Sequence, residues 1–196
     1  MSAPARLEVR ERILEGTSRA ICAAGVRSTS LEDIARESGC SRATIYRHFP
    51  GGRDELLEAL VAFEHRRFFV RLGQAVEDAT TLEEVVERGL MVAHRAVVEL
   101  DVLQIVLREQ PELLEPTLAR AARPTLRLVA EFLAPFLAAY GVDDPHEAAS
   151  YADFLARMVL SYISSPGRWD LDDAAQVHQL VRGELLGGLQ VLQVAP

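Results

Sequence analysis

The stretch that decides the fold is residues 30–49, which reads SLEDIARESGCSRATIYRHF. Its apolar residues recur at helical spacing on both sides of Gly39, which predicts two short helices, at 31–38 and 42–49. Ser30 stands where serine caps a helix N-terminus, and Gly39 suits a tight turn because glycine accepts a positive φ. Two short helices joined by such a turn form a helix-turn-helix unit. On spacing alone, the pattern also fits a plain structural corner.

The rest of the chain also shows helical rather than alternating periodicity, so we expect an all-α protein. The break Pro50-Gly51-Gly52 suggests a three-helix head over 1–53 and a larger helical body over 54–196. Pro124 predicts a kink or a split in the longest segment of the body. Besides the two short helices, the expected helices cover residues 7–24, 54–76, 82–99, 102–108, 111–140, 146–164 and 172–192.

Charge is distributed unevenly along the 196 residues, whose net charge is −8. All 21 basic residues are arginine. Residues 1–53 hold nine arginines against six acidic residues, whereas residues 54–196 hold twelve against 23. The head is therefore mildly basic and the body strongly acidic, which indicates that only the head could meet a polyanion.

Several protein classes are disfavoured by composition. Charges close to the N-terminus leave no apolar core for a signal peptide, and the uncharged runs are too short to span a bilayer, so we expect a cytoplasmic protein without a membrane partner. Cys22 and Cys40 alone cannot form a disulfide framework or a four-thiolate zinc site. No nucleophile-elbow, dinucleotide-binding, P-loop or zinc-protease motif is present. We therefore expect neither an enzyme nor a cofactor or metal.

The second short helix is predicted to present side chains that suit DNA. Arginine reaches guanine edges in the major groove, and alanine and threonine contact the thymine methyl group. Hydroxyl, phenol and imidazole groups bind phosphates. The side chains expected to point outward are those of Arg42, Ala43, Thr44 and Arg47.

Residues 25–35, 41–49 and 54–57 together resemble the DNA-binding signature of the TetR family of bacterial transcriptional regulators. The resemblance covers about residues 7–60, and its most specific string is ATIYRHF at 43–49. It implies base reading by the four outward residues just named. It also implies phosphate contacts from Thr29, Ser30, Tyr46 and His48, although Tyr46 and His48 could instead pack against the first and fourth helices.

One departure from the family pattern concerns the start of the fourth helix. The family usually has a Ser-Lys pair there, whereas this chain reads Pro50-Gly51-Gly52-Arg53 and is one residue longer. Arg53 could replace that lysine, since both donate to phosphate.

The last two predicted helices carry apolar residues on two sides and therefore need cover on both sides. The family pattern implies that they pair with the same helices of a second copy. Gly183 and Gly187 would allow a close approach between helices that offsets their cost in helix propensity. The alternative is burial within one large monomer core. The predicted dimer interface contains Leu155, Val159, Ile163, Leu180, Gly183, Gly187 and Val191.

The resemblance also implies that helices of the body enclose a small-molecule effector. Aromatic residues at helical spacing also form plain core, so this alternative stays open. The candidate pocket residues are Met91, His94, Phe132, Phe136, Phe154, Met158 and Tyr162.

These observations predict a ligand-responsive DNA-binding regulator. The resemblance implies a repressor that binds a palindromic operator as a homodimer and is released by a small, largely apolar effector, with an activator as the alternative within the DNA-binding class. The alternative is a helical small-molecule carrier with a vestigial DNA-binding head.

Overall fold

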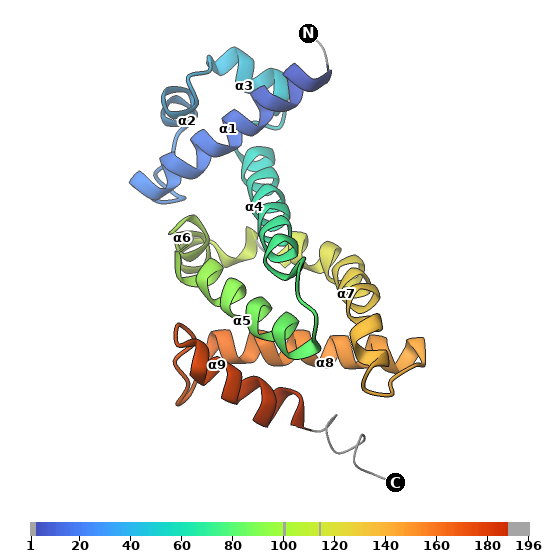
Figure 1. Cartoon of the computed structure of the whole chain (residues 1–196). Coiled ribbons are helices and arrows are strands. Elements are labelled where there is room, and N and C mark those ends of the chain that lie inside the picture. The colour runs from blue at the N-terminus through green and yellow to red at the C-terminus, as the bar shows by residue number, and fades with distance from the viewer. Residues whose placement is uncertain (1–2, 100, 114, 188–196) are drawn as a thin grey trace. The chain divides into compact units, whose positions relative to one another are not determined.

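The computed structural model describes residues 3–99, 101–113 and 115–187, and every regular element in these ranges is a helix (Figure 1). The predicted all-α fold class is confirmed. Two compact units are present. The first comprises the residues up to Arg67 together with Val98–Ala119, and the second comprises Phe68–Val97 and the residues from Arg120 onward. The division into a DNA-binding head and a ligand-binding and dimerisation body at residue 53 stays a prediction.

The first unit contains the predicted helix-turn-helix. It also takes in α6, which begins 48 positions after the head ends at residue 53. Its elements are α1 (Ala3–Ala24), α2 (Leu31–Ser38), α3 (Arg42–His48), the first part of α4 (Gly52–Val76), α6 (Asp101–Glu109) and the 3-10 turn η1 (Pro111–Leu113).

Local capping explains why α2, the turn and α3 form where they do. The Ser30 hydroxyl accepts a hydrogen bond from the Asp33 nitrogen at 3.2 Å, and the Asp33 carboxylate accepts one from the Ser30 nitrogen at 3.0 Å, which completes a capping box. Gly39 ends α2 with φ of 62°, in the left-handed region. Ser41 then caps α3 by accepting from the Thr44 nitrogen at 3.2 Å.

The first unit has a core of its own. Helix α1 crosses α2 so closely that a Cβ on Gly16 would lie 2.6 Å from the Cβ of Ser38. Cys40 in the turn is also buried, and α6 adds Val102 and Val106 to the same core. The core consists of Ile13, Leu14, Ala20, Ile21, Val26, Ile34, Cys40, Ile45, Phe49, Leu56, Leu57, Leu60, Val61, Phe63, Val102 and Val106.

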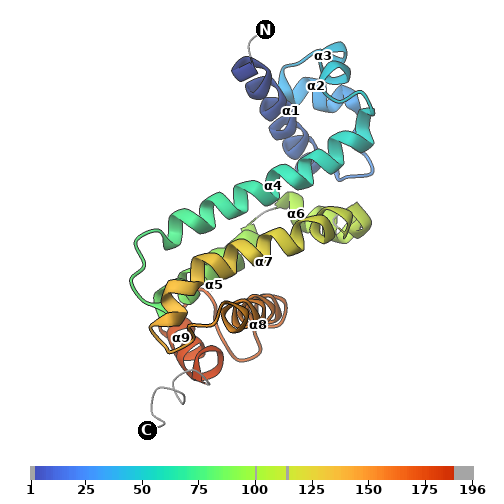
Figure 2. The same ribbon diagram turned by 90° about the vertical axis from the view of Figure 1, so that its right-hand side faces the viewer.

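The second unit is a separate helical bundle, in which α8 and α9 lie side by side in both views (Figure 1 and Figure 2). Its core includes Leu90, Leu137, Leu155 and Leu180. None of the described helices has both the length and the apolarity that crossing a membrane requires. The elements of this unit are the end of α4, most of α5 (Leu82–Glu99), most of α7 (Glu115–Ala138), α8 (Pro145–Ser164), α9 (Ala174–Leu180) and the π-helical turn η2 (Val181–Leu185).

Two predicted segments differ from the structure. The segment 111–140 begins as the 3-10 turn η1, and α7 then runs as one helix through Pro124, so the helix is not split at this proline. A kink there stays a prediction. The segment 172–192 begins as α9 and passes into the π-helical turn η2. Its last residues lie outside the described part of the chain.

Candidate nucleic-acid interface

Helix α3 separates an anchored face from an outward face, as its periodicity predicts. Ile45 and, directly after the helix, Phe49 are fully buried in the first unit's core. Tyr46 is 44% exposed although it is a large aromatic residue. Thr44 is partly exposed, and the exposed residues of the helix also include Arg42, Ala43 and Arg47. The structure thus brings the four predicted base-reading residues and Tyr46 onto one short, firmly seated helix.

Two of these outward side chains already have partners. The Thr44 hydroxyl lies 3.0 Å from the Ser41 hydroxyl, within the cap of α3. The Arg42 guanidinium forms an ion pair with Glu32, which lies in the first turn of α2. Sequence reasoning did not single out Glu32, because its role depends on the crossing of two helices.

His48 lies at the end of α3 and is 5% exposed. Its backbone oxygen accepts a hydrogen bond from the Arg10 guanidinium at 2.8 Å, and the same guanidinium lies 4.1 Å from the ring centre of Phe49. Burial lowers the pKa of His48, and the neighbouring charges of Arg47, Arg6 and Arg10 lower it further. Its Nε2 atom has no hydrogen-bond partner in the described structure. The neutral ring is therefore favoured.

Thr29 and Ser30, two other predicted phosphate contacts, are both engaged within the protein. Thr29 is buried, and its hydroxyl donates to the Gly25 oxygen at 2.7 Å. The Ser30 hydroxyl takes part in the α2 cap and donates to Asp33 at 2.6 Å. Both hydroxyls hold the loop before α2 in shape, and their predicted phosphate contacts rest on the resemblance alone.

Arg53, in the first turn of α4, faces the same loop. Its Nε donates to the Thr29 oxygen at 3.1 Å, and its Nη2 donates to the Val26 oxygen. About a third of its side chain stays exposed. The guanidinium thus lies on backbone carbonyl groups, where its planar fork suits two acceptors at once.

Glu109 holds the other side of the loop and could not be found from the sequence. Its carboxylate accepts hydrogen bonds from the Val26 nitrogen at 2.9 Å and the Arg27 nitrogen at 3.3 Å. Gly25 has φ of 84°, and a Cβ there would lie 2.7 Å from a Glu109 oxygen. Only glycine both accepts this positive φ readily and leaves room for the Glu109 carboxylate. Glu109 and Arg53 thus bind the amides and the carbonyls of one loop.

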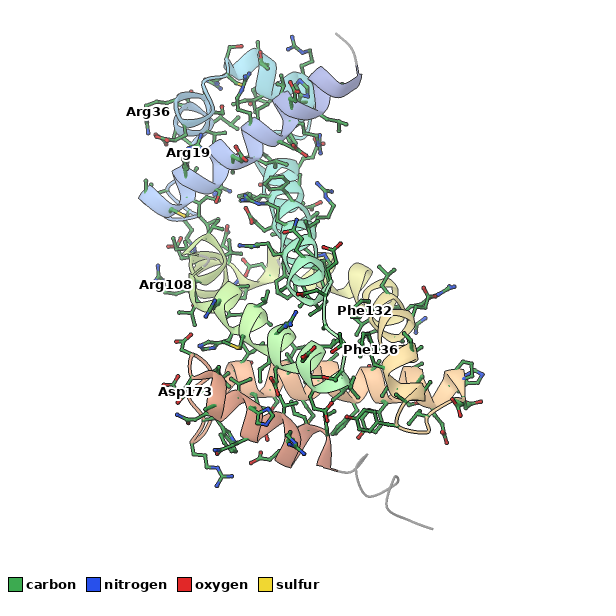
Figure 3. The ribbon with its side chains drawn as sticks, in the orientation of Figure 1. Arg19, Arg36, Arg108, Phe132, Phe136 and Asp173 are labelled. Atoms are coloured by element: carbon green, nitrogen blue, oxygen red, sulfur yellow. The ribbon has the colours of Figure 1, made fainter. Side chains whose placement is uncertain are left out.

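The residues predicted to line an effector pocket fall into two groups. Met91, Phe136, Met158 and Tyr162 are partly buried and pack against the core of the second unit. Phe132 and Phe154 are each about 40% exposed, and Figure 3 shows Phe132 beside Phe136 on α7, with their ring centres 5.7 Å apart. The assignment of these residues to an effector pocket stays a prediction.

Two polar members of the predicted pocket have partners in the second unit. His94 Nε2 lies 3.8 Å from an Asp172 carboxylate oxygen, while its buried Nδ1 has no hydrogen-bond partner in the part of the chain that is described. The Tyr162 hydroxyl donates to Glu184, which links α8 to η2 and raises the pKa of Tyr162. Glu184 also pairs with Arg168 at 3.2 Å.

The residues predicted to form a dimer interface differ in how much surface they offer. Leu155 and Leu180 are buried within the single chain, so they belong to its core. Val159 and Ile163 are partly exposed, Gly183 is exposed and Gly187 is partly exposed, whereas Val191 lies outside the described residues. The structure adds Leu160 of α8, which is 63% exposed.

Comparison with known proteins agrees with this arrangement. The sequence profile described as "Bacterial regulatory proteins, tetR family" matches residues 13–60. An uncharacterised HTH-type transcriptional regulator of Mycobacterium tuberculosis is 30% identical over 177 residues, which cover 87% of this chain and 82% of the relative. These relatives are transcriptional regulators rather than enzymes.

Solved structures share the fold at lower identity. GusR of Salmonella enterica aligns with a TM-score of 0.67 and 19% identity, over 97% of this chain and 98% of its own. The transcriptional regulator FadR of Bacillus subtilis, solved in complex with stearoyl-CoA, aligns with a TM-score of 0.60 and 17% identity. The alignment covers 87% of this chain and 96% of FadR. The likeness therefore extends over both units.

Proposed function

The chain belongs to the TetR family of bacterial transcriptional regulators, and on this premise we propose that it is a ligand-responsive repressor. It binds a palindromic operator as a homodimer. A small, largely apolar effector binds the second unit and favours a conformation with lower operator affinity. Such a change requires an effector that binds the two conformations with different affinity.

The observation that carries this proposal is the outward face of α3. A helix that is anchored by Ile45 and Phe49 and presents two arginines and a tyrosine has the chemistry of a recognition helix in the major groove. Arg42, Ala43, Thr44 and Arg47 read bases in this proposal, and Tyr46 binds a phosphate. Thr29, Ser30, His48 and Arg53 support these contacts by holding the loop and the helix ends.

Pairing of two copies is supported by the apolar surface that α8 leaves uncovered in a single chain. Leu160 and Phe154 are exposed, and Val159 and Ile163 are partly exposed beside them. Gly183 adds no side chain, and open space surrounds the position of its missing Cβ. We propose that α8 and the segment from α9 onward meet the same segments of a second copy. Leu160→Glu should then shift the sedimentation of the protein from dimer to monomer.

The apolar character of the effector is supported by the aromatic and sulfur-bearing side chains at the core edge, Met91, Phe136 and Met158. FadR of Bacillus subtilis, which has the same fold, was solved in complex with stearoyl-CoA. We propose that the effector of this protein is likewise largely apolar. A thermal-shift screen of acyl and aromatic compounds, followed by release from the operator, tests this part of the proposal.

The main experiment is selection of binding sites from a pool of random DNA duplexes at two salt concentrations. Recovery of a palindrome, with binding that is lost in Arg42→Ala and weakened in Tyr46→Phe, would support the proposal. A chain that enriches no sequence and shows no salt-dependent binding would overturn it and favour the carrier with a vestigial head. Glu58→Gln, an exposed change on α4, serves as the control variant.

A further inference from the structure

An acidic side chain lies directly against the first base-reading residue of α3. Glu32, in the first turn of α2, pairs with the Arg42 guanidinium through one carboxylate oxygen and Nη1. Both side chains are more than half exposed, at 60% and 54%. Arg47 is exposed on the same helix and forms no ion pair with any described residue. The two arginines of α3 thus differ in one respect, since only Arg42 has an acidic partner.

The pairing has unequal effects on the two ways in which arginine binds DNA. Attraction to phosphates depends on net charge and on the release of counterions, and the adjacent carboxylate cancels the charge of Arg42. Reading of guanine depends on two directed hydrogen bonds to O6 and N7. A guanidinium has five N–H donors, so Nη1 serves Glu32 while the other donors stay available. Pairing with Glu32 therefore removes the attraction of Arg42 to phosphates of any sequence and keeps its directed hydrogen bonds to guanine.

We propose that Glu32 is a specificity-determining residue, which prevents Arg42 from acting as a phosphate anchor on arbitrary DNA and leaves it available to guanine. This inference rests on the proposed DNA-binding function. The pair is exposed, so a base edge with two acceptors can reach the guanidinium donors that Glu32 does not use. Glu32 also repels phosphates that approach Arg42 from the side of α2.

The test measures how affinity for a random-sequence duplex and for the selected operator depends on salt. In wild type, Arg42 adds nothing to the slope of log K against log salt on random DNA. In Glu32→Gln the freed guanidinium neutralises one more phosphate, so the slope should steepen by about 0.9. The ratio of operator affinity to random-duplex affinity should fall, because the extra phosphate contact raises affinity for random DNA while the contact to guanine is kept.

Two further variants identify the cause of the change. Arg42→Ala in the Glu32→Gln background should return the random-duplex slope to the wild-type value, because the extra phosphate contact comes from Arg42. Glu58→Gln removes the same charge from an exposed position on α4 and should leave the slope within error of wild type. Circular dichroism of each variant checks that the helices are unchanged.

Each remaining outcome contradicts the proposal in a recognisable way. Equal slopes for wild type and Glu32→Gln, or a steeper slope that survives Arg42→Ala, would overturn the role of Glu32 while leaving DNA binding intact. If wild type itself shows no salt-dependent binding, the proposed function fails, and this inference fails with it.

Discussion

The carboxylate of Glu109, at the end of α6, lies 2.9 Å from the backbone nitrogen of Val26, a fully buried residue in the loop between α1 and α2. The two residues are 83 positions apart. Because a buried N–H group needs a partner, the end of α6 helps to determine the conformation of the loop that leads into the helix-turn-helix. The loop is thus sensitive to the position of α6 within the first unit.

Replacing Glu109 with alanine should lower the free energy of unfolding by about 1–3 kcal/mol, since the Val26 amide then stays buried without an acceptor. Glu109→Gln keeps one oxygen that can accept and should lose clearly less. Chemical denaturation measures both values. Glu112→Ala, an exposed change in η1, should stay within about 0.5 kcal/mol of wild type. Equal losses for the alanine and glutamine variants would contradict a role for the hydrogen bonds.

The crossing of α1 and α2 gives a second prediction. Gly16→Ala places a Cβ 2.6 Å from both the Cβ and the backbone nitrogen of Ser38, so the two helices must move apart. We expect a loss of about 1–3 kcal/mol in the free energy of unfolding, as for other overpacked sites. Operator affinity should fall as well, because the helix-turn-helix is displaced.

The control for this variant is a glycine in α4. No atom outside its own stretch of helix lies within 4 Å of a Cβ built on Gly73, which is exposed in the last turn of α4. Gly73→Ala should therefore raise the free energy of unfolding by up to about 1 kcal/mol, through helix propensity alone. If Gly16→Ala also stabilised the protein, the close approach of α1 and α2 would be disproved.

The local signals of the helix-turn-helix were sufficient to predict its elements. The capping box of Ser30 and Asp33, the left-handed turn at Gly39 and the cap at Ser41 each involve residues no more than five positions apart. Such interactions depend on sequence alone, because they form within one turn of chain. The predicted helices 31–38 and 42–49 consequently differ from α2 and α3 by one residue at most.

The rest of the site depends on tertiary contacts that periodicity does not contain. Glu32 meets Arg42 only because α2 crosses α3, and Glu109 reaches Val26 only because α6 belongs to the first unit. The motif predicts a phosphate contact for His48, with packing against the first and fourth helices as the alternative, and the structure buries His48 beside Arg10 of α1. A sequence motif thus identifies which residues belong to a site, whereas the burial and the partners of those residues depend on tertiary packing.

A substitution of Arg53 can separate the effect of its positive charge from the effect of its planar hydrogen-bonding geometry. Arg53→Lys keeps the positive charge but cannot donate to the Thr29 and Val26 oxygens in the same planar fork. We expect the free energy of unfolding to fall by about 1 kcal/mol and the salt slope of DNA binding to stay unchanged. A slope reduced by about 0.9 would instead show that the guanidinium binds a phosphate in a way that lysine cannot replace.

The cap of α2 predicts a dependence of stability on pH. The hydrogen bonds from the side chain and backbone of Ser30, together with nearby Arg36, lower the pKa of Asp33 from 3.8 to about 2. Because the folded state holds this carboxylate in its charged form more strongly than the unfolded state does, Asp33 stabilises the fold above the unfolded pKa. That contribution is lost as the pH falls through the folded pKa.

Asp33→Ala should therefore be less stable than wild type at neutral pH, and the difference should shrink as the pH falls from about 4 towards about 2. Urea denaturation of both proteins across this range measures the difference directly. Glu58→Ala is a suitable control, because Glu58 is exposed on α4, caps no helix and forms no ion pair with any residue in the described ranges. A difference for Asp33→Ala that stays constant with pH would show that the capping carboxylate does not favour its charged form in the folded state.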